Sequence, residues 1–379
     1  MSTLAELLAQ GREERIHSGA AWSVGDAHGP LDRGWTGTRS WDGPPLDGDD
    51  VWDLASVTKP IAGLAVMALA ERGVLGLDET VGAHLPDYRG GDKAELTVRQ
   101  LLTHTSGIPG QVPLYRDHPT RAALLEAVRL LPLTAEPGTR VQYSSQGFIV
   151  LGLVAEAAAG QPLDELVRRL VCAPLGMRDT VFRPDDGRRA RAVATEDCPW
   201  RRRLVVGEVH DENAVVLGGV GAHAGLFSTL ANMERLGVAL AAGGRDLLRP
   251  ETLALMTAPH TDGLALRRAL AWQGRDPVDS PAGEVFGPDS YGHTGFTGTS
   301  LWVDPATGRY AVLLTNRVHP TRSGDGITAL RRAFHDIAAR MPSVAAEHRH
   351  GGGQAGGRGG PGGGASAPAR VTAPGTSPR

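Results

Sequence analysis

The sequence predicts an α+β protein in which an antiparallel sheet flanked by helices is joined to a second, mainly helical subdomain. Three observations carry this prediction: strand-like runs near the start of the chain, strand-like runs near its end, and helical periodicity in between. Such an order favours one sheet assembled from both ends of the chain. We expect one domain over residues 1–341, with its helical subdomain at about residues 60–285.

The first forty residues are expected to form a helix and a hairpin. Residues 1–18 place leucines and charged side chains at the spacing of an amphipathic helix. Residues 20–25 and 34–41 resemble short strands, and the pair Gly29-Pro30 between them has the chemistry of a turn.

The middle of the chain is expected to be mostly helical. Apolar residues recur at helical spacing in four segments, which are residues 57–72, 96–102, 121–131 and 147–159. Gly73 and Gly160 directly follow two of these segments, at the position where glycine commonly ends a helix.

The end of the chain predicts a second hairpin, a last helix and a tail. Residues 300–303 and 309–315 read as strands joined by the turn sequence Asp-Pro-Ala-Thr-Gly, and residues 326–341 as an amphipathic helix. Residues 342–379 contain almost no large apolar side chain, so they cannot offset the entropy lost on ordering. We therefore expect a disordered, Gly/Pro-rich tail there.

Composition favours an enzyme that acts on a small molecule and needs no cofactor or metal. A chain of 379 residues with 41% hydrophobic residues can bury a large core without a disulfide. A net charge of −3 gives no excess of positive charge that would favour binding to nucleic acid or to an anionic membrane. Cys172 and Cys198 lack the spacing of a zinc or redox site.

Neither a membrane span nor a standard export signal is visible in the sequence, so we expect a cytoplasmic location. The sequence does not indicate the oligomeric state.

Ser56 and Lys59 form a Ser-x-x-Lys pattern at the start of an apolar helix. Residues three positions apart lie on one face of a helix, so the lysine amine can reach the serine hydroxyl and take its proton. The helix N-terminus also favours developing negative charge. By itself the pattern is also compatible with a helix cap and a solvated lysine.

Two further motifs strengthen the catalytic interpretation. The loop sequence Tyr143-Ser144-Ser145 precedes a helical segment and could bring the tyrosine to the nucleophile. The stretch His293–Gly298 lies just before a strand, and its small residues would let a backbone edge approach a substrate.

Together the three motifs resemble those of the serine β-lactamase and penicillin-binding protein family, including class C β-lactamases and related carboxylesterases: Ser-x-x-Lys, a Tyr-x-Asn-type loop, then a Lys-Thr-Gly-type strand. The resemblance covers roughly residues 10–340 and includes the stretches 101–107 and 221–229.

The resemblance implies a role for each matched residue. Ser56 would be the nucleophile, Lys59 its base and Tyr143 the proton shuttle to the leaving group. The backbone N–H groups of Ser56 and Phe296 would form the oxyanion hole. The remaining residues expected to bind substrate are Ser145, His293, Thr294 and Gly295.

Two positions depart from the family pattern. Ser145 stands where many relatives have Asn, and so lacks the amide that could hold a substrate carbonyl. His293 stands where they have Lys, and an imidazole is mostly neutral at pH 7. Our hypothesis from these departures is an ester or amide substrate without an obligatory free carboxylate.

Other classes of protein fit the sequence less well. Residues 219–224 follow a strand-like run at 214–217 and match a loose nucleotide-binding fingerprint, but the alternating strands and helices of that fold are missing. No G-x-S-x-G pattern of a Ser-His-Asp hydrolase is present. One group of possible metal ligands consists of His210, Asp211, Glu212 and His223. Their spacing matches no established zinc-site pattern, so we expect them to line the cleft or to form structural hydrogen bonds.

The three motifs leave the fate of the acyl group open. A serine hydrolase would pass it from the acyl-enzyme to water, whereas a transacylase of the same fold would pass it to an amine or an alcohol. A catalytically silent binding protein is a further alternative, against which the intact Ser56, Lys59 and Tyr143 speak.

Overall fold

The computed structural model describes residues 3–342, and its central feature is a six-stranded antiparallel sheet. Both ends of the chain contribute strands, as predicted from the sequence. In spatial order the strands are β2 (Gly29–Gly37), β1 (Gly19–Asp26), β11 (Arg309–Thr315), β10 (Ser300–Asp304), β9 (Tyr291–Thr294) and β8 (Gln273–Gly274). The pairing of β1 with β11 joins the N-terminal hairpin to the C-terminal one, with Trp22 opposite Leu313.

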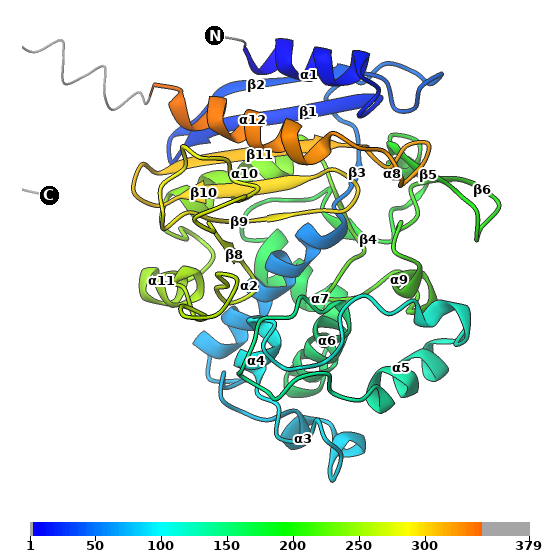
Figure 1. The fold of residues 1–379 in the computed structure, drawn as a ribbon, viewed down its shortest axis with the longest axis vertical. Helices are drawn as coiled ribbons and strands as arrows, with labels where there is room; N and C mark the ends of the chain where they lie inside the picture. The colour runs from blue at the N-terminus through cyan, green and yellow to red at the C-terminus, as the bar shows by residue number, and fades with distance from the viewer. Residues whose placement is uncertain (1–2, 343–379) are drawn as a thin grey trace, which may run out of the picture. The chain divides into compact units, whose positions relative to one another are not determined.

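Helices cover both faces of this sheet (Figure 1). On one face lie α1 (Leu4–Glu13) and α12 (Ile327–Arg340), and α10 (Leu230–Ala241) packs on the other. Alternate residues of β11 point to opposite faces, as strand geometry requires: Ala311 and Leu313 belong to the core under α1 and α12, whereas Val312 and Leu314 belong to the larger core.

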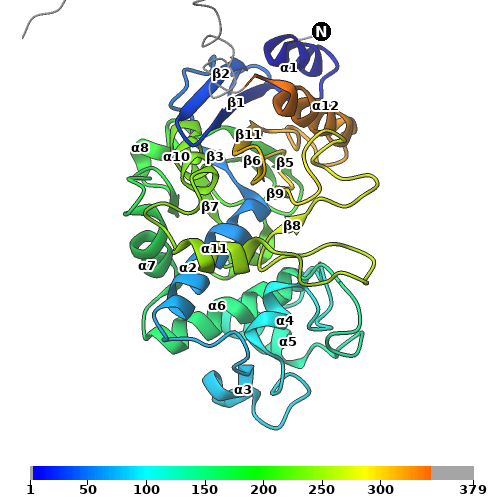
Figure 2. The same ribbon diagram turned by 90° about the vertical axis from the view of Figure 1, so that its left-hand side faces the viewer.

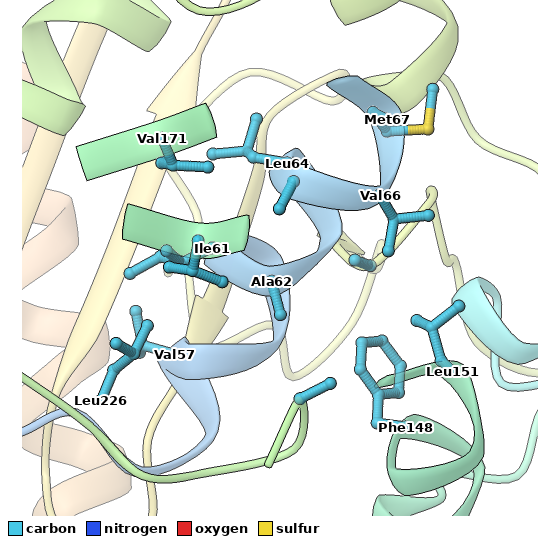
Figure 3. Packing of buried hydrophobic residues seen from close by; sticks show 14 of the residues in the cluster. Val57, Ile61, Ala62, Leu64, Val66, Met67, Phe148, Leu151, Val171 and Leu226 are labelled. Carbon is cyan, nitrogen blue, oxygen red and sulfur yellow. The ribbon is translucent and has the colours of Figure 1, made fainter. Parts of the chain in front are cut away.

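The larger core continues into the helical part of the chain around α2 (Thr58–Glu71). Its apolar residues occupy all sides of the helix, which is the pattern of a helix buried within the core. Figures 1 and 2 place α2 between the large sheet and α6 (Ser145–Ala159). Figure 3 shows Ile61 and Leu64 of α2 near Val171, and Val66 on the side facing Leu151 of α6. Packing on every side fixes the position of Ser56, which lies in the single turn Ala55–Val57 just before this helix.

The remaining elements are short. The other helices are α3 (Val81–His84), α4 (Val98–Leu102), α5 (Arg121–Leu130), α7 (Leu163–Val167), α8 (Asp186–Arg189), α9 (Glu212–Val216) and α11 (Pro250–Thr257), with single turns at Ala55–Val57, Pro86–Tyr88 and Leu114–Arg116 and a π-helical turn at Arg168–Cys172. Two small sheets are formed by β3 (Trp52–Asp53), β7 (Leu226–Ser228) and β4 (Val181–Phe182), and by β5 (Ala194–Cys198) with β6 (Arg203–Val206).

Two local predictions need correction. The run at 214–217 is not a strand but lies mostly in α9, because the Asp211 carboxylate accepts the N–H of Ala214 and caps a helix there. The turn of the first hairpin lies at residues 27–28 and not at Gly29-Pro30, which already belong to β2. The stretch His293–Gly298 does precede β10, as predicted, and its first two residues pair with β10 as the end of β9.

The other sequence-based expectations concern the helix ends, the tail and the membrane. Gly160 ends α6 in the left-handed conformation at φ 62°. The predicted tail lies outside the described residues. Within residues 3–342, no helix combines the length and the apolar character needed to cross a bilayer.

Candidate active site

Ser56 and Lys59 meet at the N-terminus of α2. The Lys59 Nζ lies 3.1 Å from the Ser56 Oγ and donates a second hydrogen bond, 3.0 Å long, to the main-chain oxygen of His223. The lysine is completely buried, whereas Ser56 is partly exposed. The pair predicted from Ser-x-x-Lys therefore has the geometry needed for proton transfer from the hydroxyl to the amine.

An unusual backbone turn presents Ser56. Ala55 has φ 46°, a conformation that residues with a side chain rarely adopt. The buried carboxylate of Asp53 supports this turn, because it accepts the N–H of Ala55 at 2.8 Å and the N–H of His210 at 2.6 Å. Burial raises the pKa of Asp53, although these backbone hydrogen bonds oppose the shift. Asp53 was missed in the sequence analysis, where its only signal was its place three residues before the serine.

Hydroxyl groups from the segment between β9 and β10 fasten the same turn. Thr297 donates to the carbonyl of Asp53 at 2.8 Å, and Thr299 donates to the carbonyl of Leu54 at 2.9 Å. Since these threonines follow Gly295 and Phe296 closely, the two predicted halves of the oxyanion hole are tied to one another. Neither Ser56 nor Phe296 donates its backbone N–H to another group of residues 3–342.

Tyr143 lies beside Lys59. The Lys59 Nζ is 4.7 Å from the centroid of the Tyr143 ring. The same amine therefore contacts both the tyrosine ring and the serine hydroxyl. The next residue, Ser144, anchors this loop: its Oγ caps α6 by accepting the N–H of Gly147 and donates to the carbonyl of Pro109. Tyr143 is thereby held at the helix start.

The ring of His104 packs against the ring of Tyr143. The two rings lie 4.7 Å apart, and the Nδ1 of His104 accepts the N–H of Ser144 at 3.1 Å. Burial, and then the charges of Arg268 and Lys59, hold the pKa of His104 well below its ordinary value. The imidazole is therefore neutral and its Nδ1 is free to accept. The stretch 101–107 signalled a role here, which the structure assigns to support of the Tyr143 loop.

The β9 end forms the other wall of the site. The imidazole of His293 is buried and its Nδ1 contacts the carbonyl of Thr294 at 2.8 Å. Burial, followed by the charges of Lys59 and Arg268, holds the pKa of His293 well below its ordinary value. A neutral imidazole at this position agrees with the expectation from sequence. At Gly295 a Cβ atom would lie 2.0 Å from the Thr299 Oγ1, so only glycine fits.

Two cavities meet at Ser56. The first brings together Ser56, Tyr143, His293, Thr294, Gly295 and Phe296 with Arg268, Gln273, Arg317 and Arg331. The second extends past Ser145 and is lined by polar side chains that include Gln111, Asp211, Glu212 and Asn213. The predicted site residues thus lie around one cleft, and the arginines of the first cavity were missed because no motif contains them.

The cluster at 210–223 is divided among separate partners. His210 contacts Glu196 at 2.9 Å, and His223 contacts Asp211 at 3.2 Å. Arg322 bonds both Glu196 and Glu212. Glu196, Cys198 and Glu212 bring potential ligand atoms within 4.8 Å of one another, but this guanidinium already pairs with both carboxylates. These side chains therefore pair with one another and with Arg322, and their contacts are structural.

The cleft thus combines a partly exposed serine with a buried lysine, next to an antiparallel sheet flanked by helices. The sequence model of the family described as Beta-lactamase matches residues 4–335, and the chain belongs to this family. A putative D-alanyl-D-alanine carboxypeptidase of Escherichia coli (strain K12) is 30% identical over 329 residues, which cover 76% of this chain and 75% of that protein. The corresponding putative carboxypeptidase of Salmonella agona (strain SL483) is 29% identical over 338 residues, with 78% of each chain covered.

Solved structures share the fold at lower sequence identity. EstCE1, described as a hydrolase with promiscuous acyltransferase activity, superposes with a TM-score of 0.73 at 22% identity, over 89% of this chain and 97% of that one. The simvastatin synthase LovD from Aspergillus terreus gives a TM-score of 0.71 at 23% identity over the same shares.

Proposed function

We propose that the protein hydrolyses a small ester or amide through an acyl-enzyme formed on Ser56. The observation that carries this proposal is the 3.1 Å contact between the Ser56 Oγ and the Nζ of the completely buried Lys59. Membership of the Beta-lactamase family supports serine hydrolase chemistry.

In the proposed reaction, Lys59 takes the proton of the Ser56 hydroxyl while the oxygen attacks the substrate carbonyl. The tetrahedral oxyanion accepts hydrogen bonds from the backbone N–H groups of Ser56 and Phe296. When the bond to the leaving group breaks, Tyr143 supplies a proton to the departing oxygen or nitrogen and regains one from Lys59. A water molecule then attacks the ester, and its proton returns through the same groups, so that Ser56 is regenerated.

Intact mass spectrometry after treatment with a fluorophosphonate tests the nucleophile. We expect one adduct on the wild-type protein, located at Ser56 by peptide mapping, and none on Ser56→Ala. Ser106→Ala is a matched control, since Ser106 is a buried serine outside both cavities, and it should label normally. An adduct that persists in Ser56→Ala would contradict the proposal.

Acyl transfer is a second candidate function, and the fold shared with EstCE1 and LovD favours it. Water and an added alcohol or amine compete for the same acyl-enzyme. If transfer dominates, a panel of such acceptors should divert most of the acyl group from hydrolysis and raise the turnover rate. Product ratios that remain with the free acid over the panel would favour the hydrolase.

A further inference from the structure

The second cavity of the cleft receives the acyl group of the substrate in the proposed reaction. Ser56, Ser145 and Asp211 line this cavity, whereas Tyr143 lines the first cavity and not the second. Because Tyr143 is the group proposed to protonate the leaving group, a substrate whose carbonyl meets the Ser56 Oγ directs its leaving group into the first cavity. The acyl group then extends into the second, which has a volume of about 270 Å³.

One oxygen of the Asp211 carboxylate has structural contacts, and the other has none. The Oδ1 accepts the N–H of Ala214 at 2.9 Å, which caps α9, and it contacts the Nε2 of His223 at 3.2 Å. The Oδ2 has no hydrogen-bond partner within residues 3–342. The side chain is 35% exposed and lines the second cavity. The Oδ2 is therefore available to a ligand in that cavity.

Asp211 carries its negative charge at neutral pH. Burial raises its pKa, but the charge and hydrogen bond of His223, the N–H of Ala214 and the charge of Lys59 outweigh burial and hold the pKa below the ordinary value of a carboxyl group. The wall of the second cavity therefore presents an anion on the acyl side of the nucleophile.

The arginines that line this cavity have other partners. Arg322 bonds two carboxylates, those of Glu196 and Glu212, so this group of three has no spare positive charge. Arg116 is exposed, and its Nε donates at 3.4 Å to the hydroxyl of the tyrosine before it in the chain. Neither arginine pairs with Asp211 in the part of the chain that the structure describes. The free oxygen of Asp211 thus lacks a cation of the protein.

Ser145 supplies a second polar group to the same cavity. The residue is only 7% exposed, and its hydroxyl has no hydrogen-bond partner among residues 3–342. Buried hydroxyl groups normally have a partner, so a hydroxyl without one in the wall of a substrate cavity indicates that the substrate provides it. Since a hydroxyl oxygen can accept a hydrogen bond, Ser145 and Asp211 can both accept from one donor group.

We infer that the second cavity binds an ammonium group on the acyl part of the substrate, which donates hydrogen bonds to the Asp211 Oδ2 and the Ser145 Oγ. This inference rests on the proposed function and names its substrate class, an ester or amide of an amino acid whose amino group is free. A protonated amine has three donors and a charge opposite to that of Asp211. An acyl group with a carboxylate would instead be repelled by this oxygen.

Pairs of phenyl esters that differ only at this group test the inference. The ester of β-alanine ends in an ammonium where the ester of butanoic acid ends in a methyl group, and the esters of 6-aminohexanoic and heptanoic acids form a longer pair. Each kcat/KM at pH 7 is divided by the rate of hydroxide-catalysed hydrolysis of the same ester. We expect the wild-type protein to favour the amino ester by about 10-fold in at least one pair, as a hydrogen bond to a charged group provides. Equal values in both pairs would overturn the inference.

Asp211→Asn removes the charge and keeps the structural contacts. The amide oxygen of asparagine can still accept the N–H of Ala214 and a hydrogen bond from His223. This variant should lower the preference for the amino ester by about 10-fold, and Asp211→Glu, which keeps the charge, should retain part of the preference. An unchanged preference in Asp211→Asn would speak decisively against the ammonium site. The wild-type comparison needs no variant, so it tests the inference even if a variant folds poorly.

Asp185 provides the matched control. Its carboxylate caps α8 by accepting the N–H of Arg188 at 2.9 Å, as Asp211 caps α9, but Asp185 lies outside both cavities. Asp185→Asn should therefore keep the full preference for the amino ester. A fall as large as that in Asp211→Asn would mean that the loss of a capping charge is the cause, and the inference would be wrong.

Fluorophosphonate labelling of Ser56 separates failure of this inference from failure of the proposed function. A wild-type protein that is labelled but shows no preference for the amino esters rejects the ammonium site alone. A wild-type protein that is not labelled rejects the proposed function, and the inference with it.

Discussion

At the scale of single residues, the site depends on a lysine that is buried among uncharged groups. Lys59 contacts the Ser56 Oγ, the main-chain oxygen of His223 and the faces of the Tyr143 and Phe148 rings. None of these contacts is with an anion, although the Asp211 carboxylate and the amine also interact through their charges. Its place next to both the hydroxyl and the phenol ring fits a group that passes a proton between them.

Replacement of Lys59 distinguishes a proton acceptor from a mere positive charge. Lys59→Met should lower kcat/KM by about 10²- to 10⁴-fold because it removes the proposed general base. Lys59→Arg should be equally slow, since a guanidinium keeps its charge but does not give up its proton. Steady-state rates with a p-nitrophenyl ester, with melting temperatures as the folding control, check this. Near-wild-type activity in a well-folded Lys59→Arg would mean that charge alone suffices.

At the scale of elements, the nucleophile turn and the end of β9 act as one unit. The hydroxyls of Thr297 and Thr299 donate to the carbonyls of Asp53 and Leu54. Arg331 of α12 donates to the carbonyls of Gly295 and Thr299. The site is therefore built where α2, β9 and α12 come together, and a shift in any one of them would move the expected oxyanion donors.

Gly295→Ala tests how tightly this unit is packed. The new Cβ would lie 2.0 Å from the Thr299 Oγ1 and 2.5 Å from the carbonyl oxygen of Leu54, so β9 must retreat from the turn. We expect the rate of fluorophosphonate labelling to fall by at least about 100-fold, the effect of losing an oxyanion donor. Thr299→Ala added to this variant should recover only part of the rate, because the clash with Leu54 remains. Labelling at the wild-type rate in Gly295→Ala would contradict the geometry.

At the scale of the whole molecule, several histidines are buried. Some lie in the packing against the large sheet, and others lie in the cleft. Burial, and then the charge of Arg12, lowers the pKa of His17 to about 4, and burial lowers that of His335 to about 4. The pKa values of His104 and His293 are also held well below 6.5. The unfolded chain, in which these groups have ordinary values, therefore binds more protons near pH 5 than the folded protein does.

This difference predicts a loss of stability in mild acid. The free energy of unfolding should fall as the pH drops from about 6.5 towards 4, by up to about 1.4 kcal/mol per pH unit for each buried histidine. Urea unfolding at pH 7, 6 and 5 measures the slope. His17→Phe cannot take a proton, so it should reduce the slope of unfolding free energy against pH by the contribution of one buried histidine. The control His28→Phe changes an exposed histidine and should leave the slope unchanged. A flat profile would show that these histidines titrate normally.

Much of the fold could be predicted because it follows local periodicity. The apolar pattern of α2, the glycine that ends α6 and the turn between β10 and β11 are properties of neighbouring residues, and the structure confirms them. The run at 214–217 was misassigned because apolar β-branched residues suit a short strand as well as a short helix, and the cap from Asp211 decided between them. The expected roles of Ser56, Lys59 and Tyr143 stay predictions, although the structure brings these residues together.

The sequence by itself determined the order of the three motifs, the family they resemble and the helix that begins at the nucleophile, because each is written in residues close together along the chain. Only the tertiary structure decided which distant groups surround that nucleophile. Asp53 is bonded to His210, Lys59 to the carbonyl of His223, and Arg268 enters the cleft from a segment without any motif. Such contacts depend on the path of the whole chain and on which charges are left without a partner, and no local pattern encodes either.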